Sequence, residues 1–283
     1  MEIKFENVSY SYKKVNYSEK KVLENINIEL KKGKVNAIIG KSGSGKTTLL
    51  ELIEHLLIPT EGQIRIDDYI LSSKDKVKNI DKLRFNIGYV SQFPEEQFFS
   101  SSVKEELELP LRFFNYKLEQ LDKRIKDVLK MVSLNENILK ENIFNLSNGE
   151  KRKLAIATAL IINPKVLILD EPTIGLDSKN KNDLIKLIRI LKNRFNKTII
   201  IVSHDIEFIH KITDYIYVLN NKKIVLEGTK YEVFKQEKLL RRYGIVVPKV
   251  IEFSNKVLNK KNIKIGYRDD INDLIKDIYR YAK

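Results

Sequence analysis

One glycine-rich stretch constrains the fold more than any other part of the chain: residues 40 to 48 read GKSGSGKTT. The buried-strand pattern VNAII precedes it, and the helical pattern LLELIEHLL follows it. This is the G-x-x-x-x-G-K-[ST] arrangement of a P-loop, in the strand-to-helix context that the motif requires. Glycines let the backbone N–H groups face inward, and the positive end of the following helix favours an anion. The stretch therefore predicts a phosphate-binding turn within an α/β fold.

A triphosphate fits such a turn, and two of its side chains have expected roles. Lys46 would reach the β- and γ-phosphates, and the hydroxyl of Thr47 would bind Mg²⁺. The whole stretch is expected to surround the phosphates: Gly40, Lys41, Ser42, Gly43, Ser44, Gly45, Lys46, Thr47 and Thr48.

A second feature is VLILDE, an apolar strand pattern that ends in Asp170 and Glu171. Two carboxylates at the end of a buried strand cost free energy unless a cation or a reaction partner meets them. Asp170 is placed to hold Mg²⁺. Because neighbouring side chains of an extended strand point in opposite directions, we expect Glu171 to point away from Asp170 and to polarise an attacking water.

The order of patterns along the chain predicts the architecture. Helical patterns at 46–56, 103–114, about 118–132, 150–161, 179–194 and 205–212 alternate with β-branched runs, which indicates a mainly parallel core sheet. The N-terminal strands and the strand at 63–66 have no helices between them, which predicts an antiparallel β-subdomain. Helices alone fill about 93–163, so a helical subdomain is inserted there. We expect one domain over 1–235 and a C-terminal helical extension over 236–283.

Composition narrows the classes of partner and site. The net charge of +14 favours an anionic partner such as a nucleotide, nucleic acid or lipid headgroup, although the lysines are scattered in small groups typical of solvated faces. Without cysteine, disulfides and thiolate metal sites are excluded. The longest apolar runs, such as LAIATALII, are shorter than the roughly 20 residues of a membrane span, and the start MEIKFENVSY does not match a signal peptide. We expect a soluble chain that meets a membrane only through its surface or a partner.

A resemblance to a known family appears at residues 146 to 150. The sequence LSNGE there is similar to the LSGGQ signature of the ATP-binding cassette (ABC) ATPases. Further family motifs follow in the same order: an early YSY, Gln92 after a strand, GLD at 175–177 and SHD at 203–205. The resemblance spans about residues 1–235. It implies a P-loop NTPase of the ABC type that binds ATP and Mg²⁺.

The resemblance also implies roles for single residues. Tyr12 corresponds to the aromatic residue that stacks on adenine, with Tyr10 as the alternative. Gln92 corresponds to the Q-loop glutamine, Asp177 to the D-loop aspartate, and His204 to the switch histidine that contacts the γ-phosphate. The implied catalytic residues are Glu171, His204 and Gln92, and the implied Mg²⁺ ligands are Thr47, Gln92 and Asp170.

In this family two ATPases pair head to tail, and each signature turn covers the P-loop of the other subunit. Ser147, Asn148, Gly149 and Glu150 would therefore contact ATP bound to a second ABC subunit. Family members usually have Gly and Gln where this chain has Asn148 and Glu150. Asn tolerates a left-handed turn, whereas Glu150 should weaken the phosphate site unless the KRK run at 151–153 offsets its charge. An unlike second subunit is favoured, and a homodimer stays open.

The Q-loop continues as QFPEEQFFSSSVKEEL, which is similar, from its QFPE start to its acidic end, to the Q-loop pattern of the energy-coupling factor (ECF) transporter ATPases, the CbiO-like group. Phe93-Pro94-Glu95 resembles the A-prime subunit, and YGIVVPKV at 243–250 resembles that group's C-terminal extension. The resemblance implies a peripheral ATPase on the cytoplasmic side of the cell membrane that powers uptake of vitamins or metal ions. An integral membrane T subunit would dock near Gln92–Phe99, and a separate S subunit would bind the substrate.

Two other functions remain open. One is the ATPase of another ABC importer or exporter. The other is a nucleic-acid or ribosome-associated ABC ATPase, which the basic charge favours. Those proteins usually carry two cassettes, a coiled-coil arm or a zinc module, whereas this chain has one P-loop and no cysteine, so no nucleic-acid partner is expected.

Overall fold

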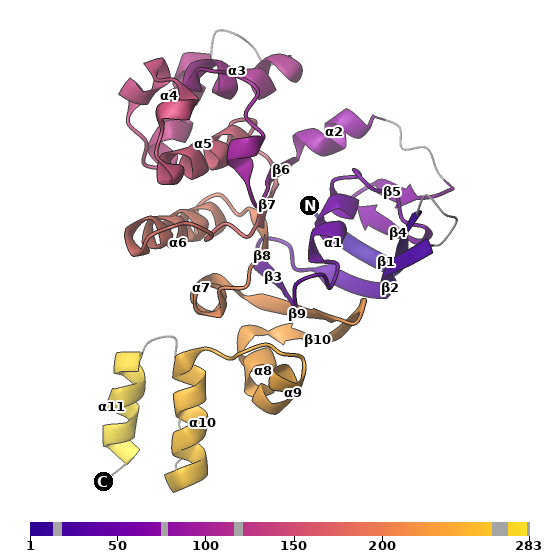
Figure 1. Ribbon diagram of the computed structural model, residues 1–283, viewed down its shortest axis with the longest axis vertical. Helices are drawn as coiled ribbons and strands as arrows, with labels where there is room; N and C mark the ends of the chain where they lie inside the picture. Colours follow the sequence, from indigo (N-terminus) through magenta and orange to yellow (C-terminus); the bar gives the residue numbers. More distant parts are fainter. Residues whose placement is uncertain (14–18, 75–78, 116–120, 262–270, 282–283) are drawn as a thin grey trace.

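The computed structural model describes residues 1–13, 19–74, 79–115, 121–261 and 271–281 (Figure 1). A central sheet of mostly parallel strands carries helices on one face and a smaller antiparallel sheet with one helix on the other. This is the α/β arrangement expected from the alternating patterns.

The central sheet places several strand ends at one edge. Its order is β10 (Lys223–Thr229), β9 (Tyr215–Asn220), β3 (Val35–Ile39), β8 (Thr198–Val202), β7 (Val166–Asp170) and β6 (Ile87–Val90). All neighbours pair in parallel except β9 and β10. Strands β3, β7 and β8 are buried along their whole length, which explains their continuous apolar patterns. The P-loop follows β3, Gln92 follows β6, Glu171 follows β7 and His204 follows β8. They therefore meet at the carboxyl edge of the sheet.

The antiparallel sheet has the order β2 (Glu19–Leu30), β1 (Ile3–Lys13), β4 (Glu61–Ile66) and β5 (Tyr69–Ser72). Helix α1 (Lys46–Ile53) lies between this sheet and the central sheet, and its Leu49 and Leu50 share one apolar core with both. The helix that begins in the P-loop is thereby fixed from two sides.

A helical region lies at the top of Figure 1. It contains α3 (Val103–Phe113), α4 (Leu121–Met131), α5 (Asn148–Leu160) and the short 3₁₀ turns Pro94–Glu96, Glu136–Lys140 and Ile143–Asn145. Helices α6 (Ser178–Asn193) and α7 (Ile206–Ile212) share its core and cover the central sheet. The short helix α2 (Ile80–Phe85), of which only Leu83 is buried, was not expected from the sequence.

The chain ends in α8 (Lys230–Lys235), α9 (Glu237–Arg242), α10 (Lys249–Lys261) and α11 (Ile271–Tyr281). Helices α10 and α11 lie side by side at the bottom of Figure 1. The backbone N–H of Lys249 donates to Glu207 of α7 at 2.8 Å, which ties the start of α10 to the main body. In the part of the chain that is described, the helices lack the length and apolar character needed to cross a membrane.

Candidate active site

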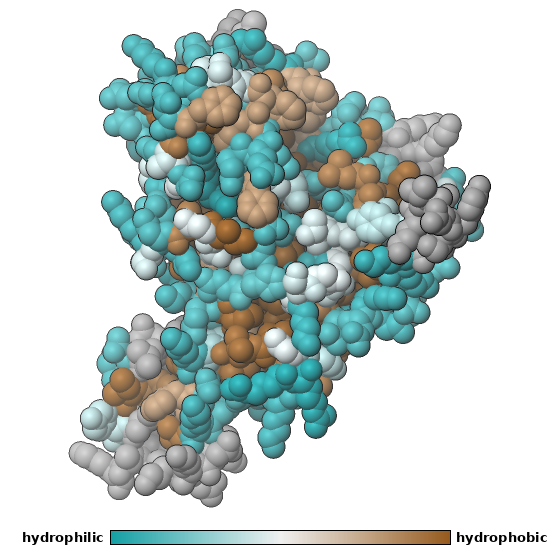
Figure 2. Space-filling view, in the orientation of Figure 1, coloured by the Kyte–Doolittle hydropathy of each residue, from teal (hydrophilic) through white to brown (hydrophobic). Residues whose placement is uncertain are grey.

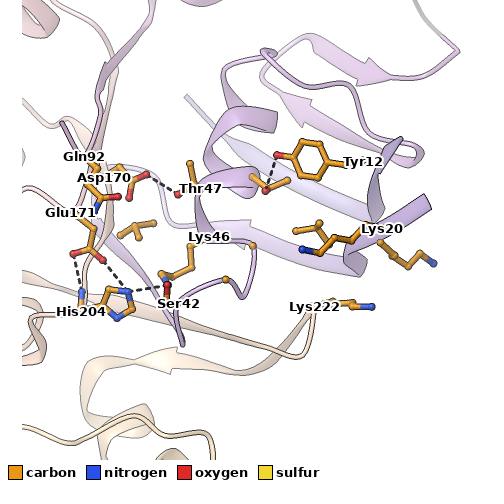
Figure 3. Close-up of a pocket in the computed structure, with 16 residues that line it drawn as sticks. Tyr12, Lys20, Ser42, Lys46, Thr47, Gln92, Asp170, Glu171, His204 and Lys222 are labelled. Atoms are coloured by element: carbon orange, nitrogen blue, oxygen red, sulfur yellow. Dashed lines mark hydrogen bonds and ion pairs between the residues drawn. The ribbon is translucent and has the colours of Figure 1, made fainter. Parts of the chain in front are cut away.

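A cavity of about 390 Å³ lies at the carboxyl edge of the central sheet (Figure 3). It brings together most of the site residues expected from the sequence: Tyr12, Ser42, Gly43, Gly45, Lys46, Thr47, Thr48, Gln92, Asp170, Glu171 and His204. These side chains come from five separate parts of the chain. Lys20, Lys21 and Lys222 also line the cavity, and the sequence motifs did not point to them.

The glycines of the P-loop occupy positions that a side chain would disturb. Gly43 and Gly45 have φ angles of 73° and 104°, in the left-handed region that favours glycine. A Cβ atom on Gly40 would lie 2.2 Å from the carbonyl oxygen of Leu219. The curled backbone expected from the motif is therefore present, with Gly45 as the N-cap of α1.

Lys46 is held by the loop itself. Its amine donates to the carbonyl oxygens of Gly40 and Lys41, both at 2.9 Å, and the residue is only 7% exposed. Burial lowers the pKa of the Lys46 amine, while Glu171 and Asp170 oppose that shift. The cation is thus positioned before any ligand arrives, which suits it to a phosphate.

Thr47 and Asp170 form a pair of oxygen ligands. The hydroxyl of Thr47 donates to Asp170 Oδ2 at 3.0 Å, and Asp170 is 3% exposed. Burial raises the pKa of the Asp170 carboxyl, and the bond from Thr47 opposes that shift in part. No group of three or more His, Cys, Asp and Glu side chains converges within the described ranges. The pair fits Mg²⁺, which binds through one or two carboxylates together with substrate phosphates.

Glu171 does not point away from Asp170, so that expectation was wrong. Strand β7 ends at Asp170, and Glu171 has a φ of 48° because its N–H donates to Val202 of β8 at 2.8 Å. This left-handed turn directs both carboxylates into the same cavity (Figure 3). A left-handed residue other than glycine costs about 1–2 kcal/mol, which the neighbouring strand must offset.

Glu171 and His204 are in contact. Glu171 Oε2 accepts from the backbone N–H of His204 at 3.1 Å, and Oε1 lies 3.4 Å from His204 Nε2. That second oxygen is buried, and nothing in the described residues donates a hydrogen bond to it. His204 Nε2 is also 3.5 Å from the amine of Lys46, so the imidazole stands between a carboxylate and a cation. The arrangement offers one free acceptor beside the phosphate-binding turn.

The two early tyrosines differ in their surroundings. Tyr12 lines the cavity, is 39% exposed, and its hydroxyl lies 3.3 Å from both Thr48 Oγ1 and Glu51 Oε2. Tyr10 is buried and supports Tyr12 edge-on, with ring centroids 4.9 Å apart. Of the two rings, that of Tyr12 is accessible to a ligand in the cavity.

The signature turn does not line this cavity. Ser147 is the N-cap of α5, and Glu150 closes a capping box in which its Oε2 accepts from the Ser147 N–H at 2.9 Å and hydroxyl at 2.7 Å. These bonds lower the pKa of Glu150, so its carboxylate is charged at neutral pH. Asn148 is the first residue of the helix and does not take the left-handed conformation considered for it. Asp177 caps α6 by accepting from the N–H of Asn180 at 2.7 Å.

The KRK run does not gather around Glu150. Lys153 pairs with Asp183 of α6 at 3.5 Å and adds only a minor attraction to Glu150. Arg152 is buried and points inward, where it donates to the carbonyl oxygen of Gln92 at 3.0 Å. Sequence reasoning missed Arg152, although helical spacing places it on the same face as the buried Ala155 and Ile156.

Glu106 is a second residue that sequence reasoning did not single out. It is 3% exposed, and its Oε2 accepts from the backbone N–H groups of Phe99 and Ser100 at 3.0 and 2.9 Å. Glu106 lies at the acidic end of the Q-loop stretch QFPEEQFFSSSVKEEL, and this position could have pointed to it. The carboxylate fixes the end of the Q-loop, where the Phe99 side chain is 83% exposed.

The fold and the cavity define a P-loop ATPase of the ABC type. Residues 23–174, more than half of the chain, match the family described as ABC transporter. The structure is similar to cbiO1 from Clostridium perfringens, described as part of the ABC transporter complex cbiONQ, with a TM-score of 0.74 and 32% identity over 89% of this chain and 98% of that one. It is also similar to a dimeric ATP-binding cassette bound to ADP and Pi, with a TM-score of 0.71 and 34% identity over 80% and 98% of the two chains.

Curated relatives narrow the family. The chain is 41% identical to the energy-coupling factor transporter ATP-binding protein EcfA2 of Clostridium perfringens, over 92% of this chain and 91% of that protein. Identity to the protein of the same name from Clostridium acetobutylicum is 39%, over 99% and 94%. The chain belongs to the energy-coupling factor transporter ATP-binding proteins, within the ABC transporter family. The fold class and family expected from the sequence are confirmed, and the chain is an ATPase coupled to transport.

Proposed function

We propose that this chain binds ATP with Mg²⁺ in the cavity of Figure 3 and hydrolyses it as one member of an ATPase pair. The main support for this proposal is that Lys46, the Thr47–Asp170 pair and the Glu171–His204 pair line one cavity. The N–H groups of the P-loop and the Lys46 amine would bind the phosphates. The exposed ring of Tyr12 would stack on adenine, and Lys20, Lys21 and Lys222 surround that end of the cavity with positive charge.

Each remaining side chain has a task in phosphoryl transfer to water. Thr47, Asp170 and Gln92 would hold Mg²⁺, which neutralises charge on the phosphates when bound. Glu171 Oε1, the buried acceptor, would orient and polarise the attacking water. His204 would contact the γ-phosphate, since its Nε2 lies 3.5 Å from the Lys46 amine that binds the same group. The Mg²⁺ ligands and His204 would thus position the nucleotide, and Glu171 would activate the water.

We propose a second ABC ATPase subunit as an obligate partner. The signature residues Ser147, Asn148, Gly149 and Glu150 lie outside this chain's own cavity and form the N-terminus of α5. Ser147 and Asn148 are exposed there, which suits this turn to ATP on another P-loop. A similar cassette was solved as a dimer with ADP and Pi, which supports the pairing. The charged Glu150 at the N-terminus of α5 gives the two sites unequal chemistry if the second subunit carries a neutral residue there. An unlike partner is therefore favoured.

We propose that an integral membrane T subunit docks beside the Q-loop, at Gln92–Phe99. Phe93 and Phe99 are 45% and 83% exposed, and Leu109 and Phe113 of α3 are 43% and 67% exposed. A hollow of about 560 Å³ lies close by, between α2 and the end of α3. Apolar side chains gather over the helical region in Figure 2. Such a set of exposed apolar side chains on one region is typical of a protein contact.

This docking would place the chain at the cytoplasmic side of the cell membrane, as a peripheral subunit of a transporter for vitamins or metal ions. A separate S subunit would bind the substrate, so this chain meets it only through the T subunit. The relatives are named for energy-coupling factor transporters, and cbiO1 is described as part of a transporter complex, which supports the assignment. The main domain would comprise 1–235, with the helical subdomain at about 93–163, and 236–283 would form the extension.

Lys46→Ala tests the proposed binding site. The substitution removes the cation from the P-loop, so the affinity of the purified chain for Mg-ATP should fall at least about 100-fold, because charge-assisted contacts to phosphate are lost. Lys153→Ala is the matched control, since that lysine pairs with Asp183 outside the cavity. Equal ATP affinity in the two variants, measured by fluorescent-nucleotide titration, would refute this binding site.

A further inference from the structure

A single buried guanidinium connects three functional segments of the chain. Arg152 is 5% exposed, and its Nη1 donates to the carbonyl oxygen of Gln92 at 3.0 Å while its Nη2 donates to that of Ile174 at 3.2 Å. In the described part of the chain it forms no ion pair within 4.0 Å. Burying a charge costs free energy unless it is hydrogen-bonded or paired. Burial lowers the pKa of the Arg152 guanidinium, and the negative charge of Glu95 opposes that shift, so the two carbonyl bonds and Glu95 together offset the cost.

Both carbonyls belong to loops that carry side chains of the ATP cavity. Gln92 lines the cavity itself. Ile174 lies midway between Glu171 and Asp177, and its N–H donates back to the Glu171 carbonyl at 3.3 Å. A displacement of Gln92 or of the Glu171 turn, when nucleotide enters or leaves, therefore acts directly on the guanidinium.

The other end of the connection is the signature turn. Arg152 lies on α5, about 7.5 Å along the helix axis from Ser147, the N-cap of that helix. The capping box between Ser147 and Glu150 fixes the turn to the helix, so the turn moves with the helix as one body. A shift transmitted to Arg152 thus reaches Ser147, which faces the ATP of the second subunit under the function proposed above.

The chemistry of arginine suits this task better than that of lysine. The planar guanidinium directs two N–H groups at two acceptors in fixed directions, whereas an ammonium is a single charge on a flexible stem. Lys153, the next residue, provides the contrast, because among the described residues its ion pair joins α5 to Asp183 of α6. The two neighbouring cations therefore hold the same helix to different parts of the molecule.

We infer that Arg152 is a positioning residue that couples the two ATP sites of the pair, by linking the Q-loop and the Glu171–Asp177 loop of one site to the signature serine of the other. The inference rests on the proposed pairing with a second ATPase subunit. It extends that function, because it names the residue through which ATP bound in one cavity affects the ATP site of the other subunit.

Cooperativity in the complete transporter tests the inference. Coupled sites give the wild-type complex a Hill coefficient above 1 for ATP hydrolysis, and Arg152→Gln should lower it to about 1 while the affinity of the isolated chain for fluorescent ATP stays within about twofold. Arg152→Lys should keep part of the cooperativity. Lys153→Gln removes a charge from the same helix and should keep the wild-type Hill coefficient.

The outcomes separate this inference from the proposed function. A wild-type complex without ATPase activity contradicts the proposed function itself. An active complex without cooperativity, an unchanged Hill coefficient in Arg152→Gln, or equal loss in Lys153→Gln overturns the coupling role. If thermal unfolding shows that Arg152→Gln does not fold, Arg152→Lys is tested in its place. The coupling role then requires a Hill coefficient for Arg152→Lys that is lower than that of Lys153→Gln.

Discussion

Replacing Glu171 by Gln should abolish turnover and leave ATP binding intact. In the structure Oε2 accepts from the His204 N–H at 3.1 Å, and an amide oxygen can keep that bond. The other position, Oε1, lies 3.4 Å from His204 Nε2 and becomes an NH₂ group that cannot accept a proton or polarise water. A positioned general base contributes about 10²–10⁴ in rate, so the barrier should rise by about 3–5 kcal/mol.

The assay is phosphate release at saturating Mg-ATP, with retained nucleotide measured on a filter. The complex should carry an inactivated second site, so that all remaining turnover belongs to this cavity. Glu136→Gln is the control, because that carboxylate pairs with Lys126 at 3.3 Å on the exposed surface of the helical region. Glu171→Gln should trap ATP in the pair, whereas turnover within tenfold of the control would refute the role of Glu171.

Substitutions at three further positions give distinct readouts. Tyr12→Ala should raise the Kd for ATP about tenfold because stacking is lost. Tyr12→Phe should not, because it keeps the ring and removes only the hydroxyl with its 3.3 Å contacts to Thr48 and Glu51. Glu106→Gln should lower the free energy of unfolding by about 1–2 kcal/mol, because the bonds from Phe99 and Ser100 are weakened. It should also reduce recovery of the T subunit in co-purification. Unchanged recovery would argue against that docking site. Asp170→Asn should raise the unfolding temperature without Mg²⁺ at neutral pH, because burial raises the pKa of Asp170 in the folded state and its ionisation opposes folding. The difference in unfolding temperature between variant and wild type should shrink as the pH falls toward 3.8. Added Mg²⁺ should stabilise only the wild type.

The sequence predicted the parts of the site that depend on local geometry. The glycines of the P-loop, the strand before it and helix α1 after it are all encoded within residues 35–53, so the motif was sufficient. Parallel strand order then explains why Gln92, Glu171 and His204 meet at one edge. Glu171 was expected from the apolar strand pattern that ends there, whereas Gln92 and His204 were expected from family resemblance, and all three line one cavity.

The features that were missed depend on long-range contacts. The left-handed turn at Glu171 is set by Val202 of a neighbouring strand, which no pattern around residue 171 encodes. Helical spacing places Arg152 on a buried face, but its two acceptors lie 60 and 22 residues away in the chain. Helix α2 has one buried residue, Leu83, so its apolar periodicity is too weak to predict it.

The proposed function requires ATP to bind between the P-loop of this chain and the signature turn of a second cassette. A structure of the purified Glu171→Gln transporter with Mg-ATP tests it most directly. We expect ATP density with the phosphates at Lys46 and Thr47, adenine against Tyr12, and the signature serine of the second subunit at the γ-phosphate. An empty cavity at saturating Mg-ATP, or ATP bound here without a second cassette over it, would refute this mode of binding.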